Sequence, residues 1–436
     1  MSDNPSEADV SRGAKAVIVV PDLGGAAVRD SEARLDEATG LAEAIGIVVV
    51  ERLYFRVRSA KAATLLGSGQ VEAIAAAVAE SGAELLIVDA AITPIQQRNL
   101  ETATKAKVID RTGLILEIFG ERAATSEGRL QVELAHLDYQ AGRLVRSWTH
   151  LERQRGGFGF LGGPGETQIE ADRRLIRDRI AKLKRELDQV ARTRGLHRAR
   201  RQKAPWPVIA LVGYTNAGKS TLFNRLTNAS VMAENLLFAT LDPTMREIAL
   251  PGFDKAIISD TVGFISDLPT QLVAAFRATL EEVLSADLII HVRDIAHPDS
   301  DAQREDVEQV LAEIGLVSGP GEGGAPRIEA WNKVDLLPAD QRERVEAEAA
   351  RKEEVVPISA LTGEGVDRLL LAAAERLRAG SKLRRLTLPA GDGEALAWLH
   401  ANGEVVEQQH NGMETELQVR ISDENWSRFQ SLQRAL

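Results

Sequence analysis

Short apolar runs alternate with amphipathic stretches over the first 110 residues. Buried strands are predicted at 16–20, 46–50, 85–88 and 107–110, with helices between them at 31–44, 70–81 and 95–104. Strands that helices cover on both faces read as continuous apolar runs, so the alternation predicts a small parallel α/β sheet with crossover helices. The segment Arg111-Thr112-Gly113 after the last strand is predicted to be a polar turn at the carboxyl edge of this sheet.

A seven-residue apolar repeat then replaces this alternation. Its apolar positions are spaced by four and three residues, at Leu130, Leu134, Leu137, Ala141, Leu144, Trp148 and Leu151. After a break the rhythm resumes, with Arg173 in one seam position, at Ile169, Ile176, Ile180, Leu183, Leu187 and Val190. A sustained heptad repeat is typical of a coiled coil, and a short connection makes two such helices antiparallel. The pattern therefore predicts a helical hairpin.

The connection between the two predicted helices is rich in glycine and carries apolar rings. We expect RNA contacts from Gly156, Gly157, Phe158, Phe160, Gly162 and Gly163, together with Arg173 and Arg174 at the start of the basic stretch 173–203. So many glycines cannot hold a core, whereas exposed phenyl rings can stack on unpaired bases and arginines can pair with phosphates. The alternatives are a floppy linker for the tip and a solvated helix face for the basic stretch.

A further apolar run, 208–212, leads into Gly213-Tyr214-Thr215-Asn216-Ala217-Gly218-Lys219-Ser220, which Thr221 follows. This is the strand–loop–helix context of a phosphate-binding loop. Its glycines allow successive backbone N–H groups to face phosphate oxygens at the positive end of a helix. We expect Lys219 to contact the β- and γ-phosphates and Ser220 to bind Mg²⁺. The segment predicts that the chain binds a nucleoside triphosphate.

Two later segments predict that the base is guanine. The apolar run 328–331 continues into Asn332-Lys333-Val334-Asp335, and the run 355–358 is followed by Ser359-Ala360-Leu361. A carboxylate at Asp335 can accept hydrogen bonds from both the N1 and N2 donors of guanine, whereas adenine offers no such pair. A backbone N–H in Ser359-Ala360-Leu361 is expected to meet the guanine oxygen. GTP is therefore the expected nucleotide.

The residues expected to act in hydrolysis lie between these segments. The run 256–259 ends in Asp260-Thr261-Val262-Gly263, where Asp260 is expected to hold Mg²⁺ through water and the Gly263 N–H to sense the γ-phosphate. The first switch loop is expected at 238–244, where we favour Thr240 over Thr244 as the residue that closes over Mg²⁺. The predicted catalytic residues are Lys219, Thr240 and Gly263, and the predicted metal-binding residues are Ser220, Thr240 and Asp260.

Phe264 occupies the position at which Ras-like enzymes place a glutamine that orients the attacking water. A phenyl ring cannot orient water, so another group must do so. Asn216 resembles the loop asparagine of GTPases that bind a potassium ion beside the phosphates, which makes K⁺ an expected helper. We predict slow intrinsic hydrolysis that a partner accelerates.

Composition narrows the class of protein. The chain of 436 residues has no cysteine, which excludes disulfides and thiolate metal sites. Residues 1–12 lack the apolar segment of a signal peptide, and no apolar run is long enough to span a membrane, so we expect a cytoplasmic protein, and a monomer. A net charge of −11 argues against a nucleic-acid partner, but the basic stretch 173–203 is a local exception.

The predicted fold class is α/β, with a phosphate-loop GTPase domain at its centre. Beyond residue 380, short strands, two helices and an Asn411-Gly412 hairpin turn predict a small α+β unit without a catalytic constellation. The predicted divisions are a flexible tail at 1–13, an α/β domain at 14–128, a helical hairpin at 129–204 with its tip at 156–165, a GTPase domain at 205–380 and a C-terminal domain at 381–436.

This order of domains, with the tip sequence GGFGFLGGPGETQIEADRR at 156–174, resembles the HflX family of GTPases. The segments 238–244 (FATLDPT) and 260–264 (DTVGF) match the family too, and the resemblance covers about 16–377. It implies binding to the large ribosomal subunit, GTP hydrolysis stimulated by it, and dissociation or rescue of stalled or idle ribosomes under heat stress. It also implies that the tip is directed towards ribosomal RNA near the peptidyl-transferase region.

Two other functions stay open at this point. One is a GTP-gated RNA-binding module, in which binding does the work and hydrolysis only resets it. The other is an RNA-modifying or RNA-remodelling factor that carries a GTPase as its regulator.

Overall fold

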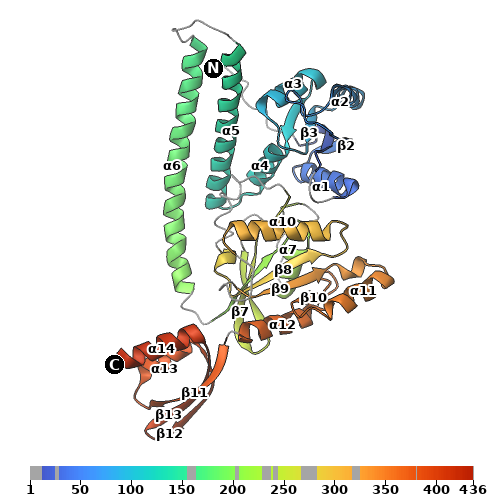
Figure 1. Cartoon of the computed structure of the whole chain (residues 1–436). Coiled ribbons are helices and arrows are strands. Elements are labelled where there is room, and N and C mark those ends of the chain that lie inside the picture. Colours follow the sequence, from blue (N-terminus) through green and yellow to red (C-terminus); the bar gives the residue numbers. More distant parts are fainter. Residues whose placement is uncertain are drawn as a thin grey trace.

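The computed structural model describes residues 12–24, 29–154, 164–201, 206–227, 237–238, 244–266, 282–316, 325–379 and 381–435. Within these residues, three sheets and a long helical hairpin make up the molecule (Figure 1). The predicted α/β class is confirmed, with a parallel N-terminal sheet, a mostly parallel central sheet and an antiparallel C-terminal sheet.

The first sheet is parallel and has the strand order β2-β1-β3-β4. Its strands are β1 (Lys15–Asp22), β2 (Val48–Arg56), β3 (Leu85–Val88) and β4 (Lys107–Asp110). The helices are α1 (Ser31–Glu43), α2 (Ser68–Ser81), α3 (Pro94–Thr104) and α4 (Arg111–Arg122). Ile18 and Val20 of β1 share a core with α1 and α4, whereas Val17 and Val19 pack with α2 and α3. Burial on both faces explains the continuous apolar run of β1.

The predicted polar turn at Arg111-Thr112-Gly113 is wrong, because these residues form the first turn of α4. Asp110 starts the helix, since its carboxylate accepts the N–H of Gly113 at 2.8 Å, as N-terminal capping residues do. Ile115 and Phe119 then pack into the core under the sheet. A polar first turn has the same composition as a loop, which is why the sequence did not distinguish the two.

Helices α5 (Ser126–Gln154) and α6 (Pro164–Arg201) form the tall hairpin in Figure 1. Leu183 of α6 is fully buried, and Arg179 donates to Glu133 of α5 at 2.7 Å. Helix α5 buries a second face, because Val132 and Ala135 join the core of the first sheet. The heptad repeat predicts the seam between the helices but not this second face. The predicted tip residues 156–163 lie outside the described part of the chain.

The second sheet has the strand order β10-β9-β8-β5-β7-β6, and all its pairings are parallel except that of β6 with β7. Its strands are β5 (Val208–Val212), β6 (Thr244–Leu250), β7 (Phe253–Asp260), β8 (Leu288–Asp294), β9 (Arg327–Asn332) and β10 (Val355–Pro357). The helices around it are α7 (Lys219–Thr227), α10 (Ser300–Glu313), α11 (Ala339–Ala349), α12 (Val366–Ala379) and the short 3₁₀ helix η1 (Val334–Leu336).

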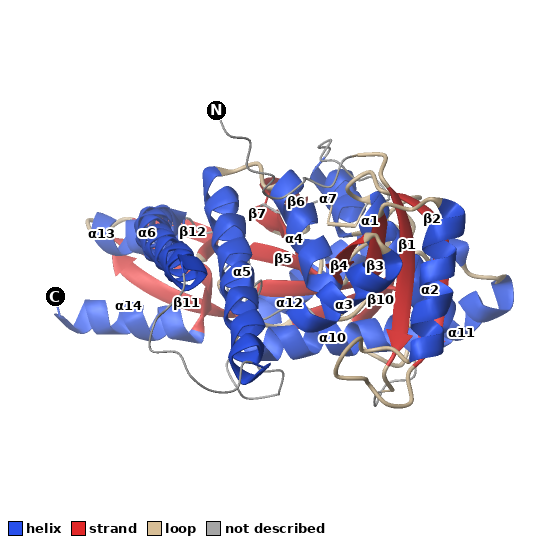
Figure 2. Ribbon diagram, turned by 90° about the horizontal axis from the view of Figure 1, so that it is seen from above, coloured by secondary structure: helices blue, strands red, loops and turns tan. Residues whose placement is uncertain are grey.

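The two faces of the second sheet have different neighbours. Helices α7 and α12 share a core with Ile209 and Leu211 on one face, and α10 packs with Ala210 and Val212 on the other. The core beneath α10 is continuous with that of α1 and α4, and Figure 2 shows these helices of the first domain above the second sheet. Before β8, residues 282–284 are helical.

The C-terminal unit is a three-stranded antiparallel sheet with two helices. Its elements are β11 (Ser381–Pro389), α13 (Gly393–Asn402), β12 (Glu404–Asn411), β13 (Glu414–Ser422) and α14 (Asp423–Ala435). Both helices pack on one face, where Phe429 lies 5.4 Å from the ring of Trp398 and 5.7 Å from that of Trp426. No helix in the described part of the chain is long and apolar enough to cross a membrane.

Candidate functional site

The phosphate-loop sequence lies between β5 and α7, at the carboxyl end of the central strand. Gly213 and Gly218 have φ angles of +152° and +97°, which L side chains rarely adopt, and a Cβ at Gly218 would collide with the side-chain amide of Asn332. The Lys219 ammonium curls back over the loop and donates to the carbonyls of Gly213 (3.1 Å) and Tyr214 (2.8 Å). Burial lowers the pKa of Lys219 to about 8, and the carboxylate of Asp260 opposes this shift.

The predicted base-binding segments lie beside the same loop. The Asn332 side chain donates to the carbonyl of Ala217 and accepts the N–H of Ala360, both at 2.8 Å. Lys333 has a positive φ of 67°, and its ammonium pairs with Asp294 at 2.6 Å. Three remaining predicted residues differ in exposure: Asp335, in η1, is half-buried, Ser359 is fully buried and Leu361 is 71% exposed. The structure thus brings the phosphate and base segments together through Asn332.

Ser220 and Asp260 also meet, although they are forty residues apart. The Ser220 hydroxyl donates to a carboxylate oxygen of Asp260 at 2.7 Å, at the end of β7. A hydroxyl and a carboxylate are hard oxygen donors of the kind that Mg²⁺ prefers, so these residues fit the predicted metal. No group of three or more His, Cys, Asp and Glu side chains able to hold a metal occurs among the described residues. A magnesium ion here would therefore need oxygen atoms of the nucleotide or of water as further ligands.

The segment after Asp260 packs directly onto the phosphate loop. The Phe264 N–H donates to the Gly213 carbonyl at 3.1 Å, and the Thr215 N–H donates to the Phe264 carbonyl at 2.7 Å. A Cβ on Gly263 would lie 2.7 Å from the Thr215 methyl group, so a side chain there would force the segment away. The Phe264 ring is 2% exposed and belongs to the core shared with the first domain. The residue in the glutamine position is thus a core residue.

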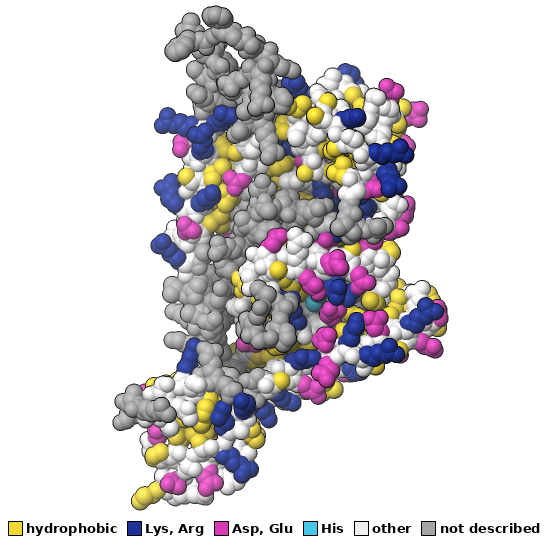
Figure 3. Space-filling model, in the orientation of Figure 1, with side chains coloured by type: hydrophobic (Ala, Val, Ile, Leu, Met, Phe, Trp, Pro, Cys, Tyr) yellow, Lys and Arg dark blue, Asp and Glu magenta, His cyan; other side chains and the backbone are white. Residues whose placement is uncertain are grey.

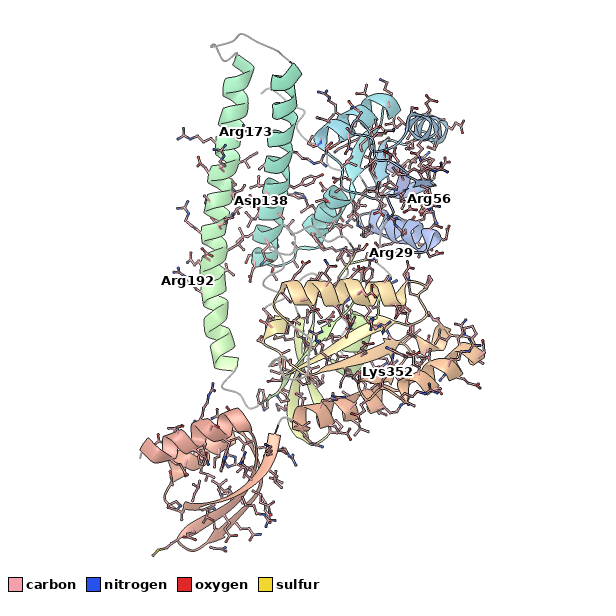
Figure 4. The ribbon with its side chains drawn as sticks, in the orientation of Figure 1. Arg29, Arg56, Asp138, Arg173, Arg192 and Lys352 are labelled. Atoms are coloured by element: carbon pink, nitrogen blue, oxygen red, sulfur yellow. The ribbon has the colours of Figure 1, made fainter. Side chains whose placement is uncertain are left out.

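The other predicted residues lie in these or other elements, or outside the described part of the chain. Thr240 lies outside the described residues, and Thr244 is the first residue of β6. Thr221 is the third residue of α7, and Asn216 adopts a left-handed conformation with φ 58°. Arg173 and Arg174 lie on α6, away from the second sheet; Figure 4 labels Arg173.

A buried polar cluster, Glu37–Arg111–Tyr214–Ser266, joins the first domain to the phosphate loop. The Glu37 carboxylate accepts from the Tyr214 hydroxyl and from Nη2 of Arg111, both at 2.6 Å, and from the Ser266 hydroxyl at 3.2 Å. Arg111 also donates to the Ser266 hydroxyl (2.8 Å) and pairs with Asp89. The Tyr214 oxygen accepts the Ser266 N–H at 2.8 Å. These contacts connect α1 and α4 with both the phosphate loop and the segment after Gly263.

The charges in this cluster stabilise one another. Burial acts to raise the pKa of Glu37, but the Arg111 guanidinium and the Tyr214 hydroxyl more than offset it, so this pKa lies below its ordinary value. Burial and the Glu37 carboxylate raise the pKa of Tyr214, which keeps its hydroxyl protonated as a donor. A second contact lies nearby, where Arg29 pairs with Asp306 of α10 at 2.5 Å (Figure 4).

The sequence does not indicate this cluster. Tyr214 and Glu37 are 177 residues apart, and the local pattern at Arg111 predicts a turn. One local signal is the bulky Tyr214 directly after the first glycine of the phosphate loop.

Family models match nearly the whole chain. The matches are to a GTP-binding GTPase N-terminal region (32–120), a GTP-binding GTPase middle region (122–201), a 50S ribosome-binding GTPase (208–331) and an HflX C-terminal domain (344–436). Together these four regions follow the order of the sheets and the hairpin along the chain.

Curated relatives cover about nine tenths of the chain. The GTPase HflX of Magnetococcus marinus is 50% identical over 396 residues, which are 91% of this chain and 90% of that protein. The GTPase HflX of Escherichia coli is 42% identical over 406 residues, 91% of each chain. Among solved structures, a GTP-binding protein from Sulfolobus solfataricus in complex with GDP is 24% identical with a TM-score of 0.43, covering 84% of this chain and 99% of that one. The chain belongs to the HflX family and is a GTP-hydrolysing enzyme.

Proposed function

We propose that the chain is a ribosome-dependent GTPase that docks on the large ribosomal subunit in the cytoplasm and promotes dissociation or rescue of stalled or idle ribosomes, as a stress response. Its GTPase region matches a family described as 50S ribosome-binding. The observation that carries the proposal is the contact of Lys219, Ser220, Asp260 and Asn332 around one loop, in a chain that also has a long basic hairpin.

In this proposal the nucleotide lies along the phosphate loop. Lys219 exchanges its two loop carbonyls for β- and γ-phosphate oxygens, and the N–H groups of 213–221 face the phosphates. Asp335 and a backbone N–H of 359–361 recognise guanine. Ser220 and Asp260, with Thr240, would hold Mg²⁺, and the ion would supply positive charge beside the β- and γ-phosphates. The Gly263 N–H contacts the γ-phosphate.

Catalysis in this proposal is incomplete without a partner. Phe264 is packed into a core, so its side chain supplies neither a hydrogen bond nor a charge to the attacking water. A K⁺ ion held beside Asn216 would supply part of the missing positive charge. The ribosome supplies the rest, and the protein alone is therefore slow.

The hairpin is the proposed RNA-contacting arm. Along the outer edge of α6, basic side chains gather, as Figure 3 shows, and Arg174, Arg177, Lys182 and Arg192 among them are exposed. Because α5 is anchored to the first sheet through Val132 and Ala135, the exposed side of α6 is the side free to meet phosphate groups.

The test is GTP turnover by the pure protein in potassium buffer, with and without large ribosomal subunits. We expect stimulation of about a hundredfold, which corresponds to a barrier lowered by roughly 2.7 kcal/mol. Turnover that large subunits leave unchanged would refute ribosome dependence. Deleting 156–165 should abolish the stimulation and leave the intrinsic rate unchanged, and stimulation that survives the deletion would refute the role of the tip.

The second candidate is a GTP-gated binding module. The basic arm supports this function as much as it supports a ribosome-dependent enzyme. A non-hydrolysable GTP analogue separates the two. If subunits separate with the analogue, binding does the splitting and hydrolysis serves recycling. If separation requires GTP itself, hydrolysis is part of the splitting step.

A further inference from the structure

Arg225 connects the helix of the phosphate loop with the loop that follows β10. It lies near the end of α7, the helix that begins with Lys219. Its Nε donates to the carbonyl of Ala360 at 2.6 Å, and its Nη2 donates to the carbonyl of Leu361. One planar guanidinium therefore holds two successive carbonyls, a geometry that an arginine fork suits and a single ammonium does not.

Both backbone polar groups of Ala360 are held by side chains. Its N–H is held by Asn332, which is itself bonded to the carbonyl of Ala217 in the phosphate loop. Its carbonyl is held by Arg225, which belongs to the helix after that loop. The loop at 359–361 is thus tied twice to the phosphate-binding elements, once from each side of the same residue.

Gly363, in the same loop, packs against the Arg225 guanidinium. It has a φ of +95°, and a Cβ there would lie 2.7 Å from Nη1 of Arg225. The turn is closed by the Gly363 N–H, which donates to the Ser359 carbonyl at 2.8 Å. The guanidinium therefore occupies space that only a glycine leaves open.

We propose that Arg225 is a positioning residue for base recognition, which fixes the backbone of 359–361 and so places the one N–H of this loop that would meet the guanine oxygen. This inference rests on the proposed guanine site. A backbone donor cannot adjust its own position, so recognition depends on what holds the loop, and small misplacements of recognition groups are costly. Arg225 also sets the distance between the phosphate end and the base end of the site, because it lies on the same helix as Lys219 and Ser220.

The experiment measures the dissociation constants of GDP and of 2-aminopurine riboside diphosphate, which keeps the 2-amino group and lacks both the 6-oxygen and the N1–H; the loss of the N1–H affects the contact with Asp335 equally in wild type and in variants of Arg225. Arg225→Ala should raise the constant for GDP about tenfold and that for the analogue less than about twofold, where tenfold corresponds to about 1.4 kcal/mol. Arg225→Lys should lie between wild type and Arg225→Ala. In turnover, KM for GTP should rise while kcat stays unchanged.

Arg378→Ala is the matched control. Its guanidinium also donates to a backbone carbonyl, that of Pro251 at 2.7 Å, but on a loop next to β7 rather than at 359–361. It should leave the ratio of the two constants as in wild type. Equal weakening of both ligands by Arg225→Ala, or none, would overturn the proposal.

Asp335→Asn separates this inference from the guanine site on which it rests. If Asp335→Asn weakens GDP but Arg225→Ala does not change the ratio, only the role of Arg225 fails. If Asp335→Asn leaves GDP binding intact, the assignment of the base site itself is wrong, and the proposal falls with it.

Discussion

Replacing Glu37 by glutamine should loosen the contact between the first domain and the phosphate loop. The carboxylate accepts from three donors, on Arg111, Tyr214 and Ser266. Glutamine has the same shape but only one acceptor oxygen, so its amide would face the Tyr214 hydroxyl or the guanidinium as another donor. Arg111 would keep Asp89 as its partner, which limits the loss.

The magnitude follows from burial. The side chains of Arg111 and Glu37 are 5% and 17% exposed, so solvent screens their pairing little. Removing one partner of a fully buried pair costs about 3–5 kcal/mol, and hydrogen bonds to charged groups contribute about 1.5–3 kcal/mol each. Because Arg111 keeps Asp89, we expect a loss of about 2–3 kcal/mol in the free energy of local opening, or roughly 30- to 150-fold in the opening equilibrium.

Hydrogen exchange measures this opening without requiring that the whole chain unfold in one step. The Ser266 N–H, bonded to the Tyr214 oxygen, is the reporter amide, and exchange of the segment 262–266 should accelerate. Asp36→Asn is the matched control, because Asp36 lies one residue away on α1 and pairs with Arg52 at 2.9 Å while 65% exposed. A surface pair contributes roughly 0–1 kcal/mol. Equal exchange rates in the two variants would refute the account of the cluster.

Three further predictions concern the nucleotide site. Since burial lowers the pKa of free Lys219 to about 8 and bound phosphates favour its charged form, GDP binding should take up a proton above pH 8 and weaken as pH rises towards the ordinary pKa of 10.5. Calorimetry at pH 9 in buffers of different ionisation enthalpy measures this uptake, and its absence would contradict a contact between Lys219 and phosphate. Asp335→Asn should shift preference from GDP to xanthosine diphosphate, because an amide can pair with a carbonyl, and competition binding checks this. If Asn216 helps to hold K⁺, replacing potassium by sodium should slow turnover several-fold, whereas identical rates would contradict the role of the ion.

Local patterns explain how much of this fold the sequence predicts. β1 is apolar at every buried position because both its faces are covered, and the phosphate loop is recognisable because Gly213, Gly218 and Lys219 stand at a fixed spacing within one short segment. The heptad repeat likewise predicts the seam of the hairpin, because apolar residues such as Leu183 recur there at fixed spacing. Each of these signals lies within a few turns of chain, and the order of the elements follows from them.

The parts that could not be predicted depend on contacts between distant residues. Nothing near Glu37 indicates that it faces Tyr214, and nothing near Arg225 indicates Ala360, because these pairs are 177 and 135 residues apart. Val132 and Ala135 fall between the seam positions of α5, so the heptad repeat gave no reason to bury them. Arg111 was misassigned because a polar tripeptide after a strand describes a turn and a capped helix equally well.

Asp110 and Arg111, at the start of α4, bind two different parts of the molecule. Asp110 ends β4, starts α4, and accepts hydrogen bonds from Tyr139 and Arg143 of α5, both at 2.7 Å. The next residue, Arg111, bonds to Glu37 and to Ser266 of the second domain. Two consecutive residues therefore hold the base of the helical arm and the segment that follows Gly263.

Asp110 and Arg111 are adjacent in the chain. If the segment after Gly263 moves and Ser266 keeps its hydrogen bond to Arg111, α4 must therefore move with it. Asp110 would then carry α5 along, or lose its two bonds to that helix. A connection between the arm and the nucleotide site thus runs through the N-terminal sheet, where buried charged side chains fix the geometry.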